Sequence, residues 1–221
     1  MFGTKKPLWG EQPAQKKHYD AVLIGGGLHN LATAYYLAKE HNMTNVAVVE
    51  KRFIGFGGAG RNTAIVRANQ RTQENVPLYK EALDLWPELT KELDFNLMFN
   101  NCGNVNLMHS EAAMKAARMN VSTAQFLGVE SHVLDAKQTK ELVPPLNLSQ
   151  DITHPIHGSM YHPPGGIVRH DAVVWGLAKG AARLGVDILQ QTEAQEISTS
   201  QGKVTGVQTS QGNISTPKVL V

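Results

Sequence analysis

Cysteine is almost absent from this sequence. The 221 residues include one, Cys102. A lone cysteine cannot form an intrachain disulfide, and it cannot supply the several thiolates of a cysteine-based metal centre. We therefore expect neither a disulfide framework nor a cysteine metal site, and we assign Cys102 no chemical role.

Charged residues are also few. They make up 18% of the chain, and the formal net charge is +2. Proteins that bind nucleic acid or anionic membrane surfaces through charge usually carry a strong excess of basic residues. Neither number indicates such an excess, so we expect no nucleic-acid partner and no membrane partner.

Long apolar runs are missing as well. No run approaches the roughly 20 residues that a membrane-spanning helix needs. The lysines near the N-terminus are not followed by the hydrophobic core of a secretory signal. We expect a soluble, cytoplasmic protein in which residues 1–17 form a tail, or an arm lying on a partner with Trp9 as its anchor.

The stretch from Tyr19 to Glu50 carries the strongest pattern in the sequence. It reads YDAVLIGGGLHNLATAYYLAKEHNMTNVAVVE. A short apolar run over 21–24 precedes three glycines, a helical pattern follows, and a second apolar run ends in an acid. The helix is expected to bury Leu31, Ala34, Tyr35 and Ala38. This order of strand, turn, helix and strand predicts the first half of a dinucleotide-binding fold.

The glycines and the acid would serve different chemical purposes in such a fold. Gly25 allows a tight turn, and Gly27 lets a pyrophosphate approach the N-terminus of the helix. Glu50 has the spacing of the acid that accepts hydrogen bonds from ribose hydroxyls, and its charge disfavours NADP. Asn30 stands where the usual motif has a third glycine. We expect its side chain to push the helix outward or to weaken binding; a βαβ unit that binds no nucleotide remains the alternative.

A second glycine cluster follows Glu50. Four glycines lie within residues 55–60; Arg61, Asn62 and Thr63 come directly after them, and Arg67 follows. Such a loop can lie against a flat group or bring backbone N–H groups to an anion. Because it follows the ribose-binding strand, we expect it to return to the mouth of the cofactor cleft. A flexible surface loop is the alternative.

The middle of the chain predicts helices and one hairpin. Helical spacing covers 76–93, with Pro87 as a kink or break, and helices are also expected over 110–127 and 135–144. Alternation over 95–108 predicts a hairpin around an Asn-Asn-Cys-Gly turn. The first helix is expected to bury Leu78, Ala82, Leu85, Trp86 and Leu89; the second is expected to be capped by Ser110 and to pack Met114 and Met119.

Three histidines, His154, His157 and His162, lie within residues 151–166. Their spacing could suggest a metal site, but the prolines between them forbid a continuous helix. Asp151 is the only nearby residue that could add to the ligand set. We expect no metal site here, and we expect a strand that runs into a proline–glycine turn.

The last part of the chain returns to the α/β pattern. A helix is expected to start at His170 and Asp171, to bury Val174, Leu177, Ala178 and Ala181, and to end at Gly185. A parallel strand and a β-meander with turns at 201–202 and 211–212 follow. The chain stops within an apolar run, and we expect that a C-terminal part is missing.

Four stretches together resemble one family. They are GGGLHNLATAYYLAKEH, VAVVEK, GGAGRNTAIVRANQ and GGIVRHDAVVWGLAKGAARLGVDIL. From Asp20 to Val221 the chain is similar to the beta subunits of heterotetrameric sarcosine oxidases, which are flavin-dependent amine oxidases related to D-amino-acid oxidase. The resemblance implies an α/β protein with a Rossmann-like FAD-binding fold of the D-amino-acid-oxidase type. It places the incomplete FAD-binding domain at 18–75 and 165–221 and an inserted α+β substrate or cap segment at 76–164.

The resemblance also implies roles for individual residues. Noncovalent FAD would be bound by Gly25, Gly27 and Glu50, and Arg61, Asn62 and Thr63 would lie near its isoalloxazine ring. Arg67 would bind the substrate carboxylate, and His170 would carry covalent FMN. Leu28 and Asn30 stand where the family motif has glycines.

The implied reaction is the oxidation of sarcosine to glycine and a one-carbon unit. Electrons would pass from FAD to FMN, where oxygen is reduced to hydrogen peroxide, and tetrahydrofolate would take up the one-carbon unit. Alpha, gamma and delta subunits would be the partners. Two alternatives stay open: an FAD-only oxidase or dehydrogenase of another small amino acid, and an inactive fragment that keeps only subunit contacts.

Overall fold

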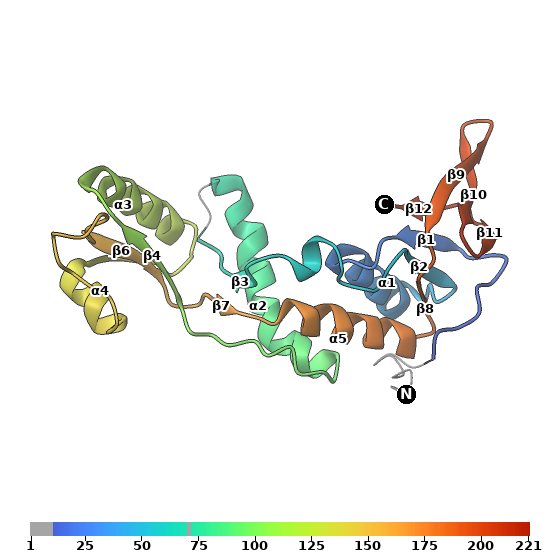
Figure 1. Ribbon diagram of the computed structural model, residues 1–221, viewed down its shortest axis with the longest axis horizontal. Coiled ribbons are helices and arrows are strands. Elements are labelled where there is room, and N and C mark those ends of the chain that lie inside the picture. Colours follow the sequence, from blue (N-terminus) through green and yellow to red (C-terminus); the bar gives the residue numbers. More distant parts are fainter. Residues whose placement is uncertain (1–10, 70–71) are drawn as a thin grey trace. The chain divides into compact units, whose positions relative to one another are not determined.

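The computed structural model describes residues 11–69 and 72–221 and divides the chain into two compact units (Figure 1). The first unit consists of the residues up to 63, residues 90–97 and residues 169–221. The second unit consists of residues 64–89 and 98–168. Each unit therefore collects segments that lie far apart in the sequence.

A parallel four-stranded sheet forms the centre of the first unit, in the order β12-β1-β2-β8. Its strands are β1 (Ala21–Ile24), β2 (Val46–Glu50), β8 (Asp187–Gln190) and β12 (Val219–Leu220). The apolar runs predicted as parallel strands are confirmed. Their nearly continuous burial is typical of a parallel sheet covered on both faces.

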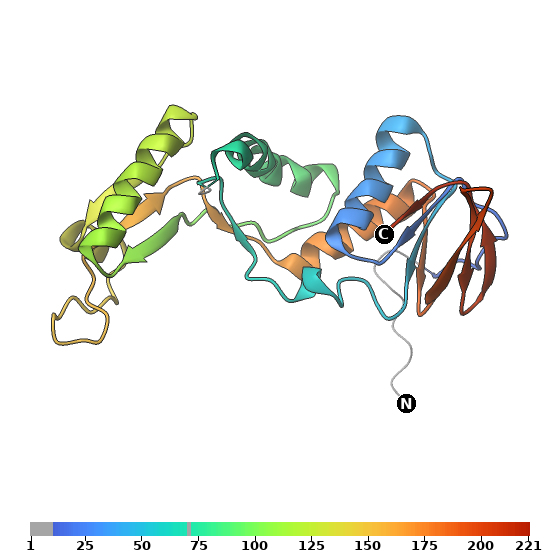
Figure 2. The ribbon, with the colours of Figure 1, turned by 90° about the horizontal axis from the view of Figure 1, so that it is seen from above.

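Two helices cover one face of this sheet, and Figure 2 shows them side by side. They are α1 (Leu28–His41) and α5 (His170–Arg183). The predicted inner faces of both helices are confirmed, since every side chain expected to be buried has little exposure. Between β2 and the second unit, the chain forms a short 3-10 turn, η1 (Gly58–Gly60). This arrangement of parallel strands and crossover helices is an α/β, Rossmann-like fold.

An antiparallel meander packs against the other face of the sheet. It contains β9 (Ala194–Ser200), β10 (Lys203–Thr209) and β11 (Gly212–Ser215), in the order β11-β10-β9. Val207 and Ile214 of the meander join Val22, Val49 and Leu189 of the parallel sheet in one buried cluster. The predicted meander and its turns are confirmed.

The described part of the N-terminal arm lies on its own unit. Gln12 exchanges two hydrogen bonds with the backbone of Gln190, at 3.0 and 3.1 Å. Lys16 forms an ion pair of 2.9 Å with Asp187. The prediction of a tail is therefore wrong for this segment, whereas an arm that also lies on a partner stays a prediction; Trp9 lies outside the described residues.

The second unit is built around a three-stranded antiparallel sheet in the order β4-β6-β5. The strands are β4 (Asn104–Met108), β5 (His132–Asp135) and β6 (Gly158–His162); a small ribbon pairs β3 (Ile65–Val66) with β7 (Gly166–Ile167). The helical segments are η2 (Gln73–Asn75), α2 (Val76–Glu92), α3 (Glu111–Phe126) and α4 (Ala136–Leu142). Ala117 and Val121 of α3 pack on Met160 of β6, and the Ser110 cap is confirmed by a 3.1 Å hydrogen bond from Ala113 N–H.

The hairpin predicted over 95–108 is wrong. Only its second half is a strand, β4, and β4 pairs with β6 from a distant part of the sequence. Asn100 instead forms an isolated bridge with Ile167. The alternation of polar and apolar residues marks a half-buried strand, but it does not identify the neighbouring strand.

The predicted inner face of α2 is confirmed only in part: Trp86 packs against a buried cluster, but other residues of that face are exposed. Leu78 is 71% exposed and Leu85 is 50% exposed, whereas Val76 and Leu83 are buried with Ala68. The apolar residues of this helix cover more than one stripe, so their spacing alone does not select the buried one. Pro87 lies inside the helix without ending it. Met119 of α3, expected in the core, is 65% exposed.

Within residues 11–69 and 72–221, no helix combines the length and the apolar character that crossing a membrane requires.

Candidate functional site

A cavity of about 530 Å³ lies in the first unit, where the chain leaves β1 and β2. Ligands of open α/β sheets bind outside the carboxyl ends of the strands, which is where this cavity lies. Both glycine clusters and Glu50 line it. The lining residues include Gly25, Gly27, Asn30, Glu50, Gly57, Gly58 and Asn62.

Each of the three glycines of the turn suits its position for a different geometric reason. Gly25 has a φ of +106°, which a residue with a Cβ rarely adopts. A Cβ on Gly26 would lie 2.8 Å from Cγ2 of Ile54, so the turn needs glycine there as well. Gly27 precedes the first residue of α1, and a Cβ there would meet no atom within 4 Å. This open backbone at a helix N-terminus fits a pyrophosphate.

Glu50 fits the role of the ribose-binding acid. One carboxylate oxygen accepts a hydrogen bond of 2.8 Å from Gly26 N–H, and the other accepts one of 2.8 Å from Arg52 N–H. A carboxylate has about four acceptor positions, so each oxygen can still accept a hydroxyl. The contact with Gly26 was missed from the sequence, although the middle glycine of the triplet was a visible signal.

The expectation that Asn30 pushes α1 outward is wrong. Its side chain is buried, and Nδ2 donates to the carbonyl of Ile24 at 2.8 Å and to that of Gly25 at 3.1 Å. Asn30 therefore ties the first turn of α1 to the end of β1. A glycine at this position would let α1 and β1 pack closely. The Asn30 side chain instead joins them through two hydrogen bonds.

Replacing Asn30 with glycine is expected to lower the free energy of unfolding by about 2 kcal/mol, because two hydrogen bonds are lost and a helical position receives glycine. Urea unfolding of the two proteins measures this difference. Asn42→Gly is the matched control, since Asn42 ends the same helix with a φ of 52° that glycine adopts readily. An equal loss in both variants would contradict the role given to the Asn30 side chain.

The glycine-rich loop brings only part of the predicted flavin loop to this cavity. Asn62 lines the cavity, and its Nδ2 donates to the carbonyl of Ala59 at 2.7 Å. Arg61 folds back on its own loop, with its guanidinium 4.4 Å from the ring centre of Phe56 and hydrogen-bonded to the Phe56 carbonyl. Arg61 and Thr63 are exposed and are not among the residues that line the cavity.

His170 is the first residue of α5 and is half-buried. Its Nδ1 is buried and has no hydrogen-bond partner within the described part of the chain. The two residues next to His170 in the sequence pair with each other: the guanidinium of Arg169 donates to the carboxylate of Asp171 at 2.6 and 3.0 Å. This pair lowers the pKa of Asp171. His170 does not line the glycine cavity.

Arg67 lies in the second unit, where it lines a different cavity of about 730 Å³. Its Nη1 donates to the backbone carbonyl of Asn69 at 3.3 Å and to Asn69 Oδ1 at 3.4 Å. Asn69, Asn106 and Asn120 supply further amides to the wall, and Met108 and Met160 supply apolar surface. This amide-lined cavity could not be predicted from local patterns, because its walls come from segments that are distant along the chain.

The three histidines of residues 151–166 do not come together. His162 is buried, whereas His154 and His157 are not, and His157 lies 3.3 Å from the carboxylate of Glu111. Among the described residues, no group of three histidine, cysteine or acidic side chains could hold a metal ion.

Comparisons with known proteins agree with this geometry. The family model "DAO: FAD dependent oxidoreductase" matches residues 20–221. The chain is 42% identical to sarcosine oxidase subunit beta of Arthrobacter sp, over 97% of this chain and 53% of that protein. It is 43% identical to the subunit of the same name from Rhizobium meliloti, over 97% of this chain and 51% of that protein. The chain thus spans about half the length of these curated relatives.

Solved structures with the same fold include two named amino-acid enzymes. L-Proline dehydrogenase from P. horikoshii superposes with a TM-score of 0.83 and 27% identity, over 93% of this chain and 52% of that chain. Glycine oxidase from Bacillus cereus superposes with a TM-score of 0.79 and 27% identity, over 91% of this chain and 54% of that chain. With its Rossmann-like sheet, its glycine turn and a family match over nearly its whole length, the chain belongs to the DAO family of FAD-dependent oxidoreductases.

Proposed function

We propose that the protein containing this chain is the beta subunit of a sarcosine oxidase and that it oxidises sarcosine to glycine and a one-carbon unit. The observation that carries this proposal is the 39–43% identity to three subunits of that name, together with a glycine and Glu50 cavity suited to FAD. The reaction forms hydrogen peroxide from oxygen, and tetrahydrofolate accepts the one-carbon unit.

FAD supplies the hydride acceptor when bound. In the first unit, the backbone at Gly27 and the N-terminus of α1 would hold its pyrophosphate, and Glu50 would accept its ribose hydroxyls. Asn62 lines the same cavity and would contact the cofactor from the glycine-rich loop. The residues present fit noncovalent FAD.

Arg67 is proposed to bind the carboxylate of sarcosine. A guanidinium can donate two parallel hydrogen bonds to a carboxylate, which fixes both the position and the orientation of the substrate. Asn69 holds the Arg67 side chain through its carbonyl and its Oδ1. Orienting the substrate is the main task left to the protein, because the cofactor carries out the redox chemistry.

His170 is proposed to carry covalent FMN, which would take electrons from FAD and pass them to oxygen. Its Nδ1 is buried, so Nε2 is the nitrogen proposed for attachment. A neutral imidazole nitrogen can act as the nucleophile that such a bond requires. The alpha, gamma and delta subunits are proposed to complete the assembly around this second flavin.

An absorbance spectrum of the full-length protein, taken before and after acid precipitation, tests the two-flavin proposal. Colour in both the pellet and the supernatant is expected, from covalent FMN and released FAD. Anaerobic addition of sarcosine should bleach the FAD. Flavin found only in the supernatant would favour the second candidate, an FAD-only amino-acid oxidase or dehydrogenase, which the likeness to glycine oxidase and L-proline dehydrogenase supports.

Replacing Glu50 with alanine in the full-length protein is expected to weaken FAD binding by about 2–3 kcal/mol, because charge-assisted hydrogen bonds to the ribose are lost. Fluorescence titration of the apoprotein with FAD measures the change. Glu196→Ala removes an exposed carboxylate of the meander and serves as the control. Unchanged FAD affinity in Glu50→Ala would remove Glu50 from the site.

A further inference from the structure

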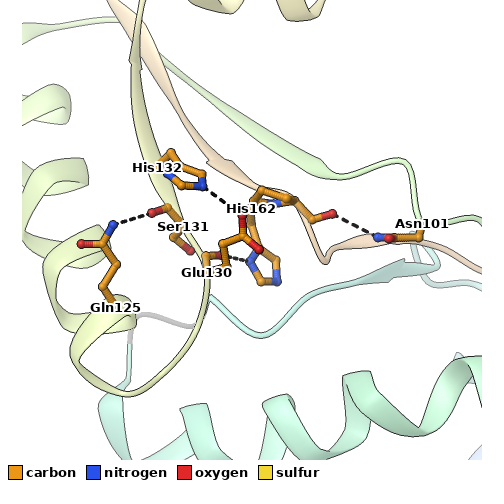
Figure 3. Close-up of polar contacts among 7 residues, drawn as sticks. Asn101, Gln125, Glu130, Ser131, His132 and His162 are labelled. Carbon is orange, nitrogen blue, oxygen red and sulfur yellow. Dashed lines mark hydrogen bonds and ion pairs between the residues drawn. The ribbon is translucent and has the colours of Figure 1, made fainter.

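His162 connects three segments of the second unit. It is fully buried at the end of β6. One ring nitrogen, Nδ1, lies 2.6 Å from the backbone carbonyl of Glu130. Figure 3 draws this contact between the His162 ring and Glu130. The other, Nε2, lies 3.2 Å from Ala68 N–H. Since a backbone N–H only donates, Nε2 is unprotonated and Nδ1 carries the ring hydrogen.

The partner of His162 on the third segment, Ala68, stands between two residues of the amide-lined cavity. Arg67 precedes it and Asn69 follows it, and both line the cavity of about 730 Å³. Asn69 also accepts from the Arg67 guanidinium through its carbonyl and its Oδ1. The hydrogen bond from Ala68 therefore fixes the backbone from which both side chains start.

We propose that His162 is a positioning residue that sets the direction of Arg67 toward the cavity by accepting the Ala68 N–H. The inference rests on the proposed function, in which Arg67 binds the substrate carboxylate. His162 does not touch the substrate. Its neutral ring holds the backbone at Ala68 through one hydrogen bond, and the amide oxygen of Asn69 accepts another from the Arg67 guanidinium.

The arrangement depends on pH, because a protonated Nε2 could no longer accept from Ala68. Burial lowers the pKa of His162, the charge of Arg67 lowers it further, and Glu130 acts in the opposite direction. The neutral ring is therefore favoured at neutral pH. Carboxylate binding should weaken only as the pH falls below the ordinary histidine range of about 6.5.

The test uses the full-length holoprotein and methoxyacetate, a sarcosine analogue with an ether oxygen in place of the amine. This probe stays ionised between pH 5.5 and 7.5, as carboxylates do, so a change in its Kd reports on the protein. His162→Leu removes the acceptor, and His162→Gln can restore it through its amide oxygen. His132→Leu, an exposed histidine of β5, is the matched control.

His162→Leu is expected to raise the Kd of methoxyacetate and the KM for sarcosine at least tenfold, with little change in kcat. His162→Gln should recover most of the loss, and His132→Leu should resemble the unaltered protein. A folded His162→Leu variant with unchanged Kd would overturn the inference, and so would a failure of the unaltered protein to bind methoxyacetate.

If His162→Leu does not fold, the unaltered protein decides the matter. Its Kd for methoxyacetate should stay constant from pH 7.5 to about 6.5 and rise only at lower pH, and a rise that begins above about pH 6.5 would overturn the inference. Failure of the proposed function gives a different result, since sarcosine would then not reduce the FAD while methoxyacetate binding still depended on His162.

Discussion

Replacing His170 with alanine in the full-length protein, assembled with its partner subunits, is expected to abolish acid-stable flavin and to leave FAD in place. The residue starts α5 and does not line the glycine cavity, so its loss should not disturb FAD binding. Oxygen reduction should slow more than the reduction of FAD by sarcosine, because His170 is proposed to serve the exit of electrons. Stopped-flow absorbance separates the two steps.

Mass spectrometry gives the sharper evidence on His170. Trypsin cleaves after Arg169, so the peptide that begins at His170 should carry the mass of FMN in the unaltered protein. The exposed histidine of β5 supplies a control, since His132→Ala should keep the modified peptide. An unmodified His170 peptide from assembled, active protein would refute covalent attachment at this residue.

Replacing Arg67 with lysine is expected to raise the KM for sarcosine well beyond tenfold. Lysine keeps the positive charge but loses the planar fork that can bind a carboxylate through two hydrogen bonds and reach Asn69 at the same time. Steady-state kinetics of the full-length protein measures the change. If the lost interaction is made equally with substrate and transition state, kcat should change little.

Two comparisons make this result specific. Arg118→Lys exchanges an exposed arginine on α3 and should leave the KM for sarcosine unchanged. Dimethylamine has no carboxylate, so its turnover should be insensitive to Arg67→Lys. An equal effect on both substrates would mean that Arg67 does not act as a carboxylate-binding residue.

Local patterns predicted the first unit well. The segment β1-α1-β2 is contiguous, and its strands, glycine turn and helix can be recognised within a few residues of each other. The same holds for α5 and the meander. These predictions succeeded because burial on one helical face or in a parallel strand leaves a periodic pattern in the sequence.

Pairing between distant segments could not be predicted in this way. The strand character of β4 was visible, but its partner β6 was not, and α2 offered more than one apolar stripe. At the site, Asn30 was wrongly expected to act as a bulky substitute for glycine. Its real partners are the carbonyls of Ile24 and Gly25, and they can be identified only from the three-dimensional structure of the turn.

His162 illustrates the same limit. In the sequence it is one of three histidines near prolines, and a metal site is the only chemical role that their spacing suggests. Its hydrogen bond to Ala68 N–H spans 94 residues. A role that depends on a backbone group so far away has no sequence signal of its own.

The parallel sheet has a consequence for how the chain is synthesised. β1 and β2 leave the ribosome well before the residues that complete their surroundings. Ile54 N–H bonds to the side chain of Gln190 across 136 residues, and the Tyr19 hydroxyl bonds to Asp187 across 168 residues. All strands of the second unit precede β8. Contacts between distant residues form slowly. The second unit can therefore fold first on the nascent chain, and until the parallel sheet of the first unit is completed, β1 and β2 keep unpaired edges.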